Sequence, residues 1–208
     1  MRPPYDAQLA IAELARRDPP LGTLIERVGP YRLTLRDMRS PFLGLLRAIV
    51  YQQLSGKAAA TIHGRLTALF ERGEVTPAAL LAMPPERLRA AGLSAAKAAA
   101  AYDLAEKTLA GIVPDADALT AMADEEIIER LVSVRGIGRW TVEMLLMFNL
   151  GRPDVLPVTD LGIRKGFMVT YGLAAMPTPS AVRLHGERWA PYRSVASWYL
   201  WRAVDQVL

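Results

Sequence analysis

The residues from Leu131 to Val142 read LVSVRGIGRWTV and place two glycines, as Gly-x-Gly, between two apolar-periodic segments. Upstream, Asp124–Glu126 offers an N-cap and an acidic first turn, and apolar residues then recur at helical spacing, which predicts a helix over about 124–133. Gly136 and Gly138 end that helix, and a second apolar-periodic helix follows. The sequence therefore predicts two helices joined by a glycine-rich hairpin.

Such a hairpin can bind an anion, because the backbone N–H groups at the start of the second helix point outward and glycine leaves room to approach them. On spacing alone, a plain tight turn is an equally good interpretation. A carboxylate, Asp160, follows nineteen residues after Thr141. Because an apolar segment begins at Leu161, Asp160 is also a good helix N-cap.

Residues 134–141 together with Asp160 resemble the hairpin and catalytic-aspartate signature of the helix-hairpin-helix DNA glycosylase superfamily, and most closely its 3-methyladenine DNA glycosylase II branch. Two further segments support this resemblance. Phe42–Ser55 is similar to the family's helix and intercalation loop, and Glu187–Ser194 with Trp201 is similar to its C-terminal helices. The match spans about residues 40 to 205.

The resemblance implies an all-α fold of two helical lobes with a helix-hairpin-helix motif and an active-site cleft between them. We expect residues 1–40 to form a short segment that packs on the C-terminal lobe. Residues 41–130 would form a central lobe that carries the intercalation loop, and residues 131–208 the hairpin, the catalytic aspartate and the C-terminal helices. Tyr31–Leu35 alternates like one short strand, a pattern that is compatible with a small β element near the N-terminus.

The implied activity is the hydrolysis of an N-glycosidic bond after the damaged base is flipped out of the duplex. A carboxylate at Asp160 can stabilise the oxocarbenium-like sugar and orient or deprotonate the attacking water. Members that also nick the strand carry a nucleophilic lysine where this chain has Trp140, so we expect no lyase activity. Lys165 lies on the same predicted helix as Asp160, so a nucleophilic amine at this unusual position remains an alternative.

The resemblance also implies which residues contact the substrate. Trp140, Trp201 and Tyr51 would line the base pocket, although core packing is an equally good interpretation of Trp140 before the family is considered. The position that fills the gap in the base stack matches Gln53, where close bacterial relatives often carry Leu. The expected DNA contacts are Gln52, Gln53, Leu54, Ser55, Arg135, Gly136, Ile137, Gly138, Arg139 and Thr141.

No catalytic cofactor is expected. The chain has no cysteine, which excludes a cysteine-ligated iron–sulfur cluster, and its two histidines, His63 and His185, are isolated. The resemblance implies a structural Na⁺ or K⁺ ion held by the main-chain carbonyls of Val132, Val134 and Ile137.

Composition bounds these expectations. The chain has 208 residues, 51% of them hydrophobic, and a formal net charge of +4, which suits a folded protein and permits a nucleic-acid partner. No long apolar run or leader-like start is present, so we expect a cytoplasmic, nucleoid-associated monomer without a membrane or an obligate protein partner. The expected partner is double-stranded DNA that contains alkylated bases.

The leading hypothesis is a monofunctional glycosylase for alkylated purines, 3-methyladenine above all and then 7-methylguanine. One alternative is a non-catalytic hairpin module that binds DNA through phosphates alone. Another is a glycosylase for neutral lesions such as hypoxanthine or ethenoadenine, and a third is a helical interaction protein without a nucleic-acid role.

Overall fold

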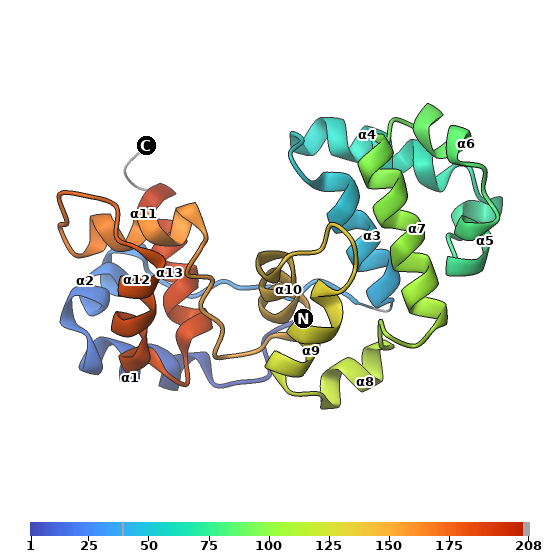
Figure 1. Cartoon of the computed structure of the whole chain (residues 1–208). Coiled ribbons are helices and arrows are strands. Elements are labelled where there is room, and N and C mark those ends of the chain that lie inside the picture. The colour runs from blue at the N-terminus through green and yellow to red at the C-terminus, as the bar shows by residue number, and fades with distance from the viewer. Residues whose placement is uncertain (39, 206–208) are drawn as a thin grey trace. The chain divides into compact units, whose positions relative to one another are not determined.

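The computed structural model describes residues 1–38 and 40–205, with side chains through Val204. Across that part of the chain every regular element is a helix, which confirms the predicted all-α fold. The helices form two compact units (Figure 1). We call residues 1–37 with those from Glu143 onward the terminal unit, and residues 38–142 the central unit.

The terminal unit combines both ends of the described chain. Its helices are α1 (Ala7–Arg17), α2 (Pro19–Val28), the π-helical turn η2 (Leu146–Leu150), α11 (Leu161–Thr170), α12 (Pro179–Gly186), the 3₁₀ turn η3 (Glu187–Trp189) and α13 (Arg193–Asp205).

Helix α13 packs against α11, α2 and α1 and supplies much of this unit's core. Trp189 and Tyr199 are fully buried and Trp198 nearly so, as expected for core aromatics. The approach of α11 to α13 depends on Gly166, because a β-carbon there would lie 1.9 Å from the carbonyl oxygen of Leu200. Only glycine allows the two helix backbones to come this close.

A buried carboxylate ties three parts of the terminal unit together. Asp18 is 1% exposed and caps the N-terminus of α2. Its Oδ2 atom accepts hydrogen bonds from the Tyr171 hydroxyl at 2.7 Å and from Trp189 Nε1 at 2.8 Å. His185 Nε2 lies 2.9 Å from the same oxygen. Because all three partners of Oδ2 come from the C-terminal part of the chain, Asp18 fastens the N-terminal helices to it.

The central unit contains the remaining helices. They are α3 (Pro41–Tyr51), α4 (Gly56–Thr67), the 3₁₀ turn η1 (Glu71–Gly73), α5 (Pro77–Leu81), α6 (Pro85–Ala90), α7 (Ala95–Leu109), α8 (Ala116–Ala121) and α9 (Asp124–Val132), and α10 (Arg139–Leu145) crosses into the terminal unit. Helix α7 packs against α3 and α5 (Figure 1).

Helix starts in the central unit follow local side-chain chemistry. Ser40 Oγ accepts from the Leu43 N–H at 3.3 Å and caps α3, and Ser94 Oγ accepts from the Lys97 N–H at 3.2 Å and caps α7. Asp124, in contrast, is not an N-cap. The cap is Ala123, whose carbonyl accepts from the Ile127 N–H, so Asp124 is the first helical residue. Its charge still suits the positive end of the helix dipole.

The alternating residues Tyr31–Leu35 form no β element. These residues are extended, and their side chains alternate between the core and solvent, with Leu33 buried. No strand runs beside them within the described residues. Leu35 exchanges backbone hydrogen bonds with Met1, and the Arg36 N–H donates to the Phe148 carbonyl, but these bonds do not continue into a ladder. The alternation therefore reflects packing on helices, not a sheet.

The boundaries between the units differ in part from those drawn on the sequence. The structure divides the chain after Asp37 and after Val142, whereas the expected limits lay at 40/41 and 130/131. The hairpin therefore belongs to the central unit. The physical reason is that hydrogen bonds from Gln52 to the Gly136 carbonyl and from the Arg135 N–H to Asp103 join the hairpin to that unit.

Candidate functional site

Asp160 is the N-cap of α11, as one interpretation of the sequence proposed. Its Oδ1 atom accepts from the Ile163 N–H at 2.8 Å and from the indole Nε1 of Trp201 at 2.9 Å. A β-carbon at Gly162 would lie 2.8 Å from Cδ1 of Trp201 and 3.0 Å from that same Oδ1 atom. Glycine at position 162 therefore leaves the room that the indole and the carboxylate need to meet.

Trp201 is held on its ring as well as through its N–H group. Its ring stacks on Phe148 with centroids 5.7 Å apart and planes 30° apart, and the Arg36 guanidinium lies 5.4 Å from the Phe148 centroid. Phe148, Arg36 and Gly162 belong to none of the sequence motifs that indicate a site, so only the structure reveals their part in it. Two fixed contacts thus orient the Trp201 indole beside Asp160.

The Gly-x-Gly segment forms the predicted turn between two helices, α9 and α10. Gly136 has φ +79°, in the left-handed region that favours glycine, and Gly138 has no positive φ. Val134 and Ile137 are buried and joined by a hydrogen bond from the Ile137 N–H to the Val134 carbonyl at 3.0 Å. The two apolar residues anchor the turn, and both glycines lie at the surface.

Charged side chains flank this turn. Arg139, at the start of α10, makes a bidentate ion pair with Glu125 of α9 at 2.8 and 2.9 Å. Because both side chains are about half exposed, this pair is weak and can be exchanged for a phosphate. Arg135 is exposed, and its backbone N–H donates to Asp103 of α7 at 2.6 Å.

The loop expected to enter the base stack follows α3 directly. Gln53 is exposed and has φ +55°, a left-handed conformation that is uncommon outside glycine. Leu54 is 39% exposed, and Ser55 caps α4 through a bond from the Ala58 N–H at 3.4 Å. Gln53 is thus presented to solvent between two helix ends.

Two of the expected pocket aromatics, Trp140 and Tyr51, belong to the central unit. Trp140 is 46% exposed, which removes the core-packing interpretation of this residue. Tyr51 ends α3, with the Arg47 guanidinium 3.9 Å from its ring centroid and the His63 ring edge-on at 6.2 Å. Burial and, to a lesser extent, the Arg47 charge lower the pKa of His63, so this imidazole stays neutral at neutral pH.

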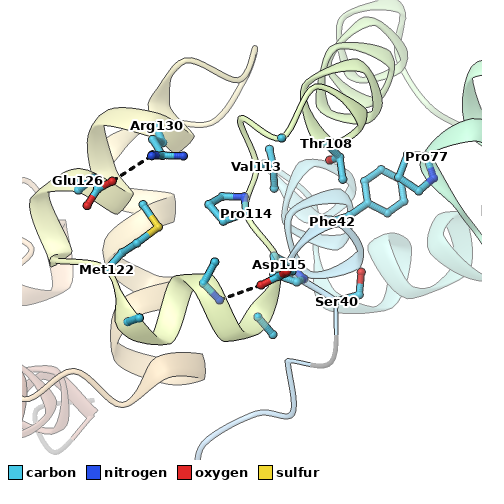
Figure 2. Close-up of a pocket in the computed structure, with 15 residues that line it drawn as sticks. Ser40, Phe42, Pro77, Thr108, Val113, Pro114, Asp115, Met122, Glu126 and Arg130 are labelled. Atoms are coloured by element: carbon cyan, nitrogen blue, oxygen red, sulfur yellow. Dashed lines mark hydrogen bonds and ion pairs between the residues drawn. The ribbon is translucent and has the colours of Figure 1, made fainter.

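Among the described residues, no group of three or more His, Cys, Asp or Glu could hold a metal ion. A pocket of about 810 Å³ in the central unit is lined by residues that include Phe42, Met122 and the ion pair of Glu126 with Arg130 (Figure 2). It contains none of the predicted site residues.

In the described part of the chain, no helix has the length and apolar character needed to span a bilayer.

Residues 46–191 match the family model of the HhH-GPD superfamily of base excision DNA repair proteins. The chain therefore belongs to this helix-hairpin-helix family, and the resemblance inferred from its motifs is confirmed. It is 41% identical to the DNA-3-methyladenine glycosylase 1 of Schizosaccharomyces pombe over 181 residues, 86% of this chain and 79% of that protein. It is 32% identical to the DNA-3-methyladenine glycosylase 2 of Escherichia coli over 166 residues, 75% of this chain and 55% of that protein.

Solved structures of similar proteins share this fold. A 3-methyladenine DNA glycosylase of Schizosaccharomyces pombe in complex with abasic DNA matches with a TM-score of 0.82 at 40% identity, over 93% of this chain and 95% of that chain. A DNA-3-methyladenine glycosidase of Bacillus halodurans matches with a TM-score of 0.88 at 35% identity, over 100% of this chain and 94% of that chain.

Proposed function

We propose that this protein is a monofunctional DNA glycosylase that excises alkylated purines, 3-methyladenine first and 7-methylguanine next, from double-stranded DNA in base excision repair. The observation that carries this proposal is the Asp160 carboxylate, held by the Ile163 N–H and the Trp201 indole at 2.8 and 2.9 Å. Trp201 belongs to α13, so this carboxylate is held from two helices at once. The names of the relatives support the same substrate class.

The proposed chemistry needs one carboxylate. Alkylation at a purine ring nitrogen makes the base cationic, so it leaves without prior protonation, and positive charge develops on the sugar as the N-glycosidic bond breaks. Asp160 would stabilise that charge, and it would orient or deprotonate the water that attacks C1′. Because Oδ1 is already held in place, little reorganisation is required in the transition state.

The aromatic residues are our candidates for holding the extruded base. An electron-poor alkylated purine is attracted to the face of an indole, so we assign stacking roles to Trp201 and Trp140 and a supporting one to Tyr51. Trp140 is exposed, and Trp201 is fixed by Phe148 and Asp160. Trp140 cannot form a Schiff base, so we expect no strand nicking. Borohydride trapping checks this, and we expect no covalent DNA adduct. An adduct that forms with the wild type but not with Lys165→Gln would instead identify Lys165 as the nucleophilic amine.

We assign backbone contacts to the hairpin and stack insertion to the loop after α3. The hairpin residues are Arg135, Gly136, Ile137, Gly138, Arg139 and Thr141, and the loop residues are Gln52, Gln53, Leu54 and Ser55. Gln53 is the proposed wedge, because it is exposed with φ +55°. The proposed substrate also leads us to expect the protein at chromosomal DNA, as part of the cytoplasmic nucleoid.

The hairpin carbonyls of Val132, Val134 and Ile137 suit a structural alkali ion. Val132 ends α9, where carbonyls lack partners within the helix, and the neighbouring Ser133 carbonyl already accepts from the Lys107 ammonium. A bound Na⁺ or K⁺ would add fixed positive charge for a phosphate. Replacing K⁺ by tetramethylammonium at constant ionic strength should then weaken binding to a short duplex, and equal affinity in both salts would remove the ion from the proposal.

Methylated duplex DNA tests the function directly. We expect the protein to release free 3-methyladenine, measured by chromatography and mass, and Asp160→Asn to slow that release by about a hundred- to a thousandfold. The amide oxygen of Asn can still accept both hydrogen bonds, so folding and DNA affinity should survive. Release only of hypoxanthine or ethenoadenine would favour the neutral-lesion alternative. No release from any lesion, with salt-sensitive duplex binding intact, would leave the non-catalytic module.

A further inference from the structure

The hairpin and the loop after α3 are joined by a side chain. Nε2 of Gln52 donates to the carbonyl of Gly136 at 2.7 Å, and the two residues are 84 positions apart in sequence and belong to one unit. Gln52 directly precedes Gln53, the proposed wedge. The bond therefore links the segment assigned to enter the base stack to the segment assigned to grip phosphates.

Helix α7 supports the first of these segments. The Lys97 ammonium donates to the carbonyls of Val50 and Gln52 at 2.7 and 2.8 Å. These carbonyls belong to the C-terminal end of α3 and its cap, where a cation and added donors are favourable. Lys97 thus fixes the backbone of Gln52 while the side chain of Gln52 reaches the hairpin.

The same helix supports the hairpin. Asp103 Oδ2 accepts from the Arg135 N–H at 2.6 Å and from the Lys107 ammonium at 2.9 Å, and that ammonium also donates to the Ser133 carbonyl. A β-carbon at Gly136 would lie 3.3 Å from Cβ of Ala100. Positions 97, 100, 103 and 107 are three or four residues apart, so they share one face of α7.

These contacts explain how an unfavourable backbone is maintained. A left-handed conformation is unfavourable for a non-glycine residue, so Gln53 holds it only where its surroundings impose it. The bonds made by Gln52 and Lys97 on the N-terminal side of Gln53, and the Ser55 cap on its C-terminal side, do so.

We propose that Gln52 and Lys97 are positioning residues that lock the Gln53 loop to the phosphate-binding hairpin, so that backbone capture places the wedge in register with the base stack. This inference rests on the proposed function. Its physical basis is that a wedge held in advance loses little conformational freedom when it enters the duplex, whereas a loose loop must be ordered at that step.

Gln52→Met tests the lock, because methionine has a similar length, adds no charge and cannot donate to the Gly136 carbonyl. The control is Gln8→Met, which makes the same change at an exposed position of α1. The probe is a duplex with an abasic-site analogue opposite 2-aminopurine, whose fluorescence rises when its stacking is lost. Undamaged duplex affinity, single-turnover excision of 3-methyladenine and the melting temperature are measured in parallel.

We expect Gln52→Met to reduce the fluorescence change and the excision rate about tenfold each, and to weaken the affinity for undamaged duplex by much less than that. Lys97→Met should act in the same direction, and the double variant should lose less than the product of the two effects. Gln8→Met should match the wild type. If the melting temperature of Gln52→Met is much lower than that of the wild type, Lys97→Met becomes the test variant, with the same expected results.

Three outcomes would overturn the lock. Unchanged fluorescence and excision in both variants would show that the loop needs no link, and an equal loss of undamaged duplex affinity would reduce Gln52 to an ordinary DNA contact. If the double variant shows the full product of the two single effects, Gln52 and Lys97 act independently and do not form one link. A wild-type protein that gives the fluorescence change without releasing any base would contradict the proposed function but leave the lock testable by fluorescence.

Discussion

The indole N–H of Trp201 donates to Oδ1 of Asp160 at 2.9 Å, across 41 residues of sequence. It joins α13 to the N-cap residue of α11. The candidate catalytic carboxylate is thereby oriented by Trp201, which the family resemblance assigns to the base pocket. Gly162 leaves the space in which the two groups meet.

Trp201→Phe should slow excision while leaving DNA affinity nearly unchanged. Phenylalanine can still stack on Phe148 but cannot donate to Asp160. Loss of a hydrogen bond to a charged group corresponds to about 1.5–3 kcal/mol, or about ten- to a hundredfold in single-turnover rate. Trp198→Phe is the matched control on the same helix, since that ring packs on Tyr31. A wild-type rate in Trp201→Phe would mean that the helix cap alone orients Asp160.

The two hairpin glycines should respond differently to alanine. Gly136→Ala places a β-carbon on a residue with φ +79° and 3.3 Å from Ala100, so we expect a loss of about 1–2 kcal/mol in the free energy of unfolding. A β-carbon at Gly138 would meet no atom within 4 Å, and the backbone there has no positive φ. We expect it to fold normally and to bind duplex DNA more weakly, because its methyl group obstructs a phosphate. Denaturant titration and fluorescence anisotropy separate the effects, and equal stability losses would contradict this assignment.

Gly166→Ala should be strongly destabilising. Its β-carbon would lie 1.9 Å from the Leu200 carbonyl oxygen, so α11 and α13 would have to separate. We expect a loss of about 3 kcal/mol or more in the free energy of unfolding, measured by denaturant titration. Gly44→Ala, in the exposed face of α3 with no atom within 4 Å, is the control and should stabilise by about 0.5–1 kcal/mol. A Gly166→Ala variant as stable as the wild type would rule out this close approach.

Asp18 should make stability depend on pH. Burial of the carboxyl raises its pKa, but the hydrogen bonds from Trp189, Tyr171 and His185 outweigh burial, and the pKa of Asp18 lies below its ordinary value of 3.8. Because the folded-state pKa is depressed, the stabilisation is fully present above the unfolded value and is lost as pH falls through the folded value. Asp18→Asn should lose about 2–4 kcal/mol at pH 7, and the difference from the wild type should shrink below about pH 4.

Asp6→Asn is the matched control for that experiment. Asp6 caps α1 through bonds from the Gln8 and Leu9 N–H groups but is exposed. Asn caps a helix about as well as Asp, so this variant should track the wild type at all pH values. A stability difference between Asp18→Asn and the wild type that stays constant from pH 7 to pH 3 would show that the Asp18 charge is not what fastens the N-terminal helices.

Local signals were sufficient for several elements of the fold. Ser40 and Ser94 start helices because a hydroxyl satisfies an amide of the first turn, and Gly136 adopts a conformation that other residues resist. Spacing also indicated Asp160 as a cap. Asp124 was expected to be an N-cap but is the first helical residue, and Tyr31–Leu35 alternates like a strand but forms no sheet. In both cases the sequence pattern fits two local structures, and the neighbouring backbone determines which one forms.

The amino-acid sequence by itself determined the helical class, the hairpin and the identity of the candidate carboxylate, because each depends on residues close together in the chain. Only the tertiary structure decided which distant groups complete them. Trp201 donates a hydrogen bond to Asp160, and Gln52 donates one to the Gly136 carbonyl, although sequence spacing relates neither pair. The same holds for the position of the hairpin in the central unit. Hydrogen bonds and packing act over a few ångströms in space, whatever the distance along the chain, so these relationships exist only once the helices have packed.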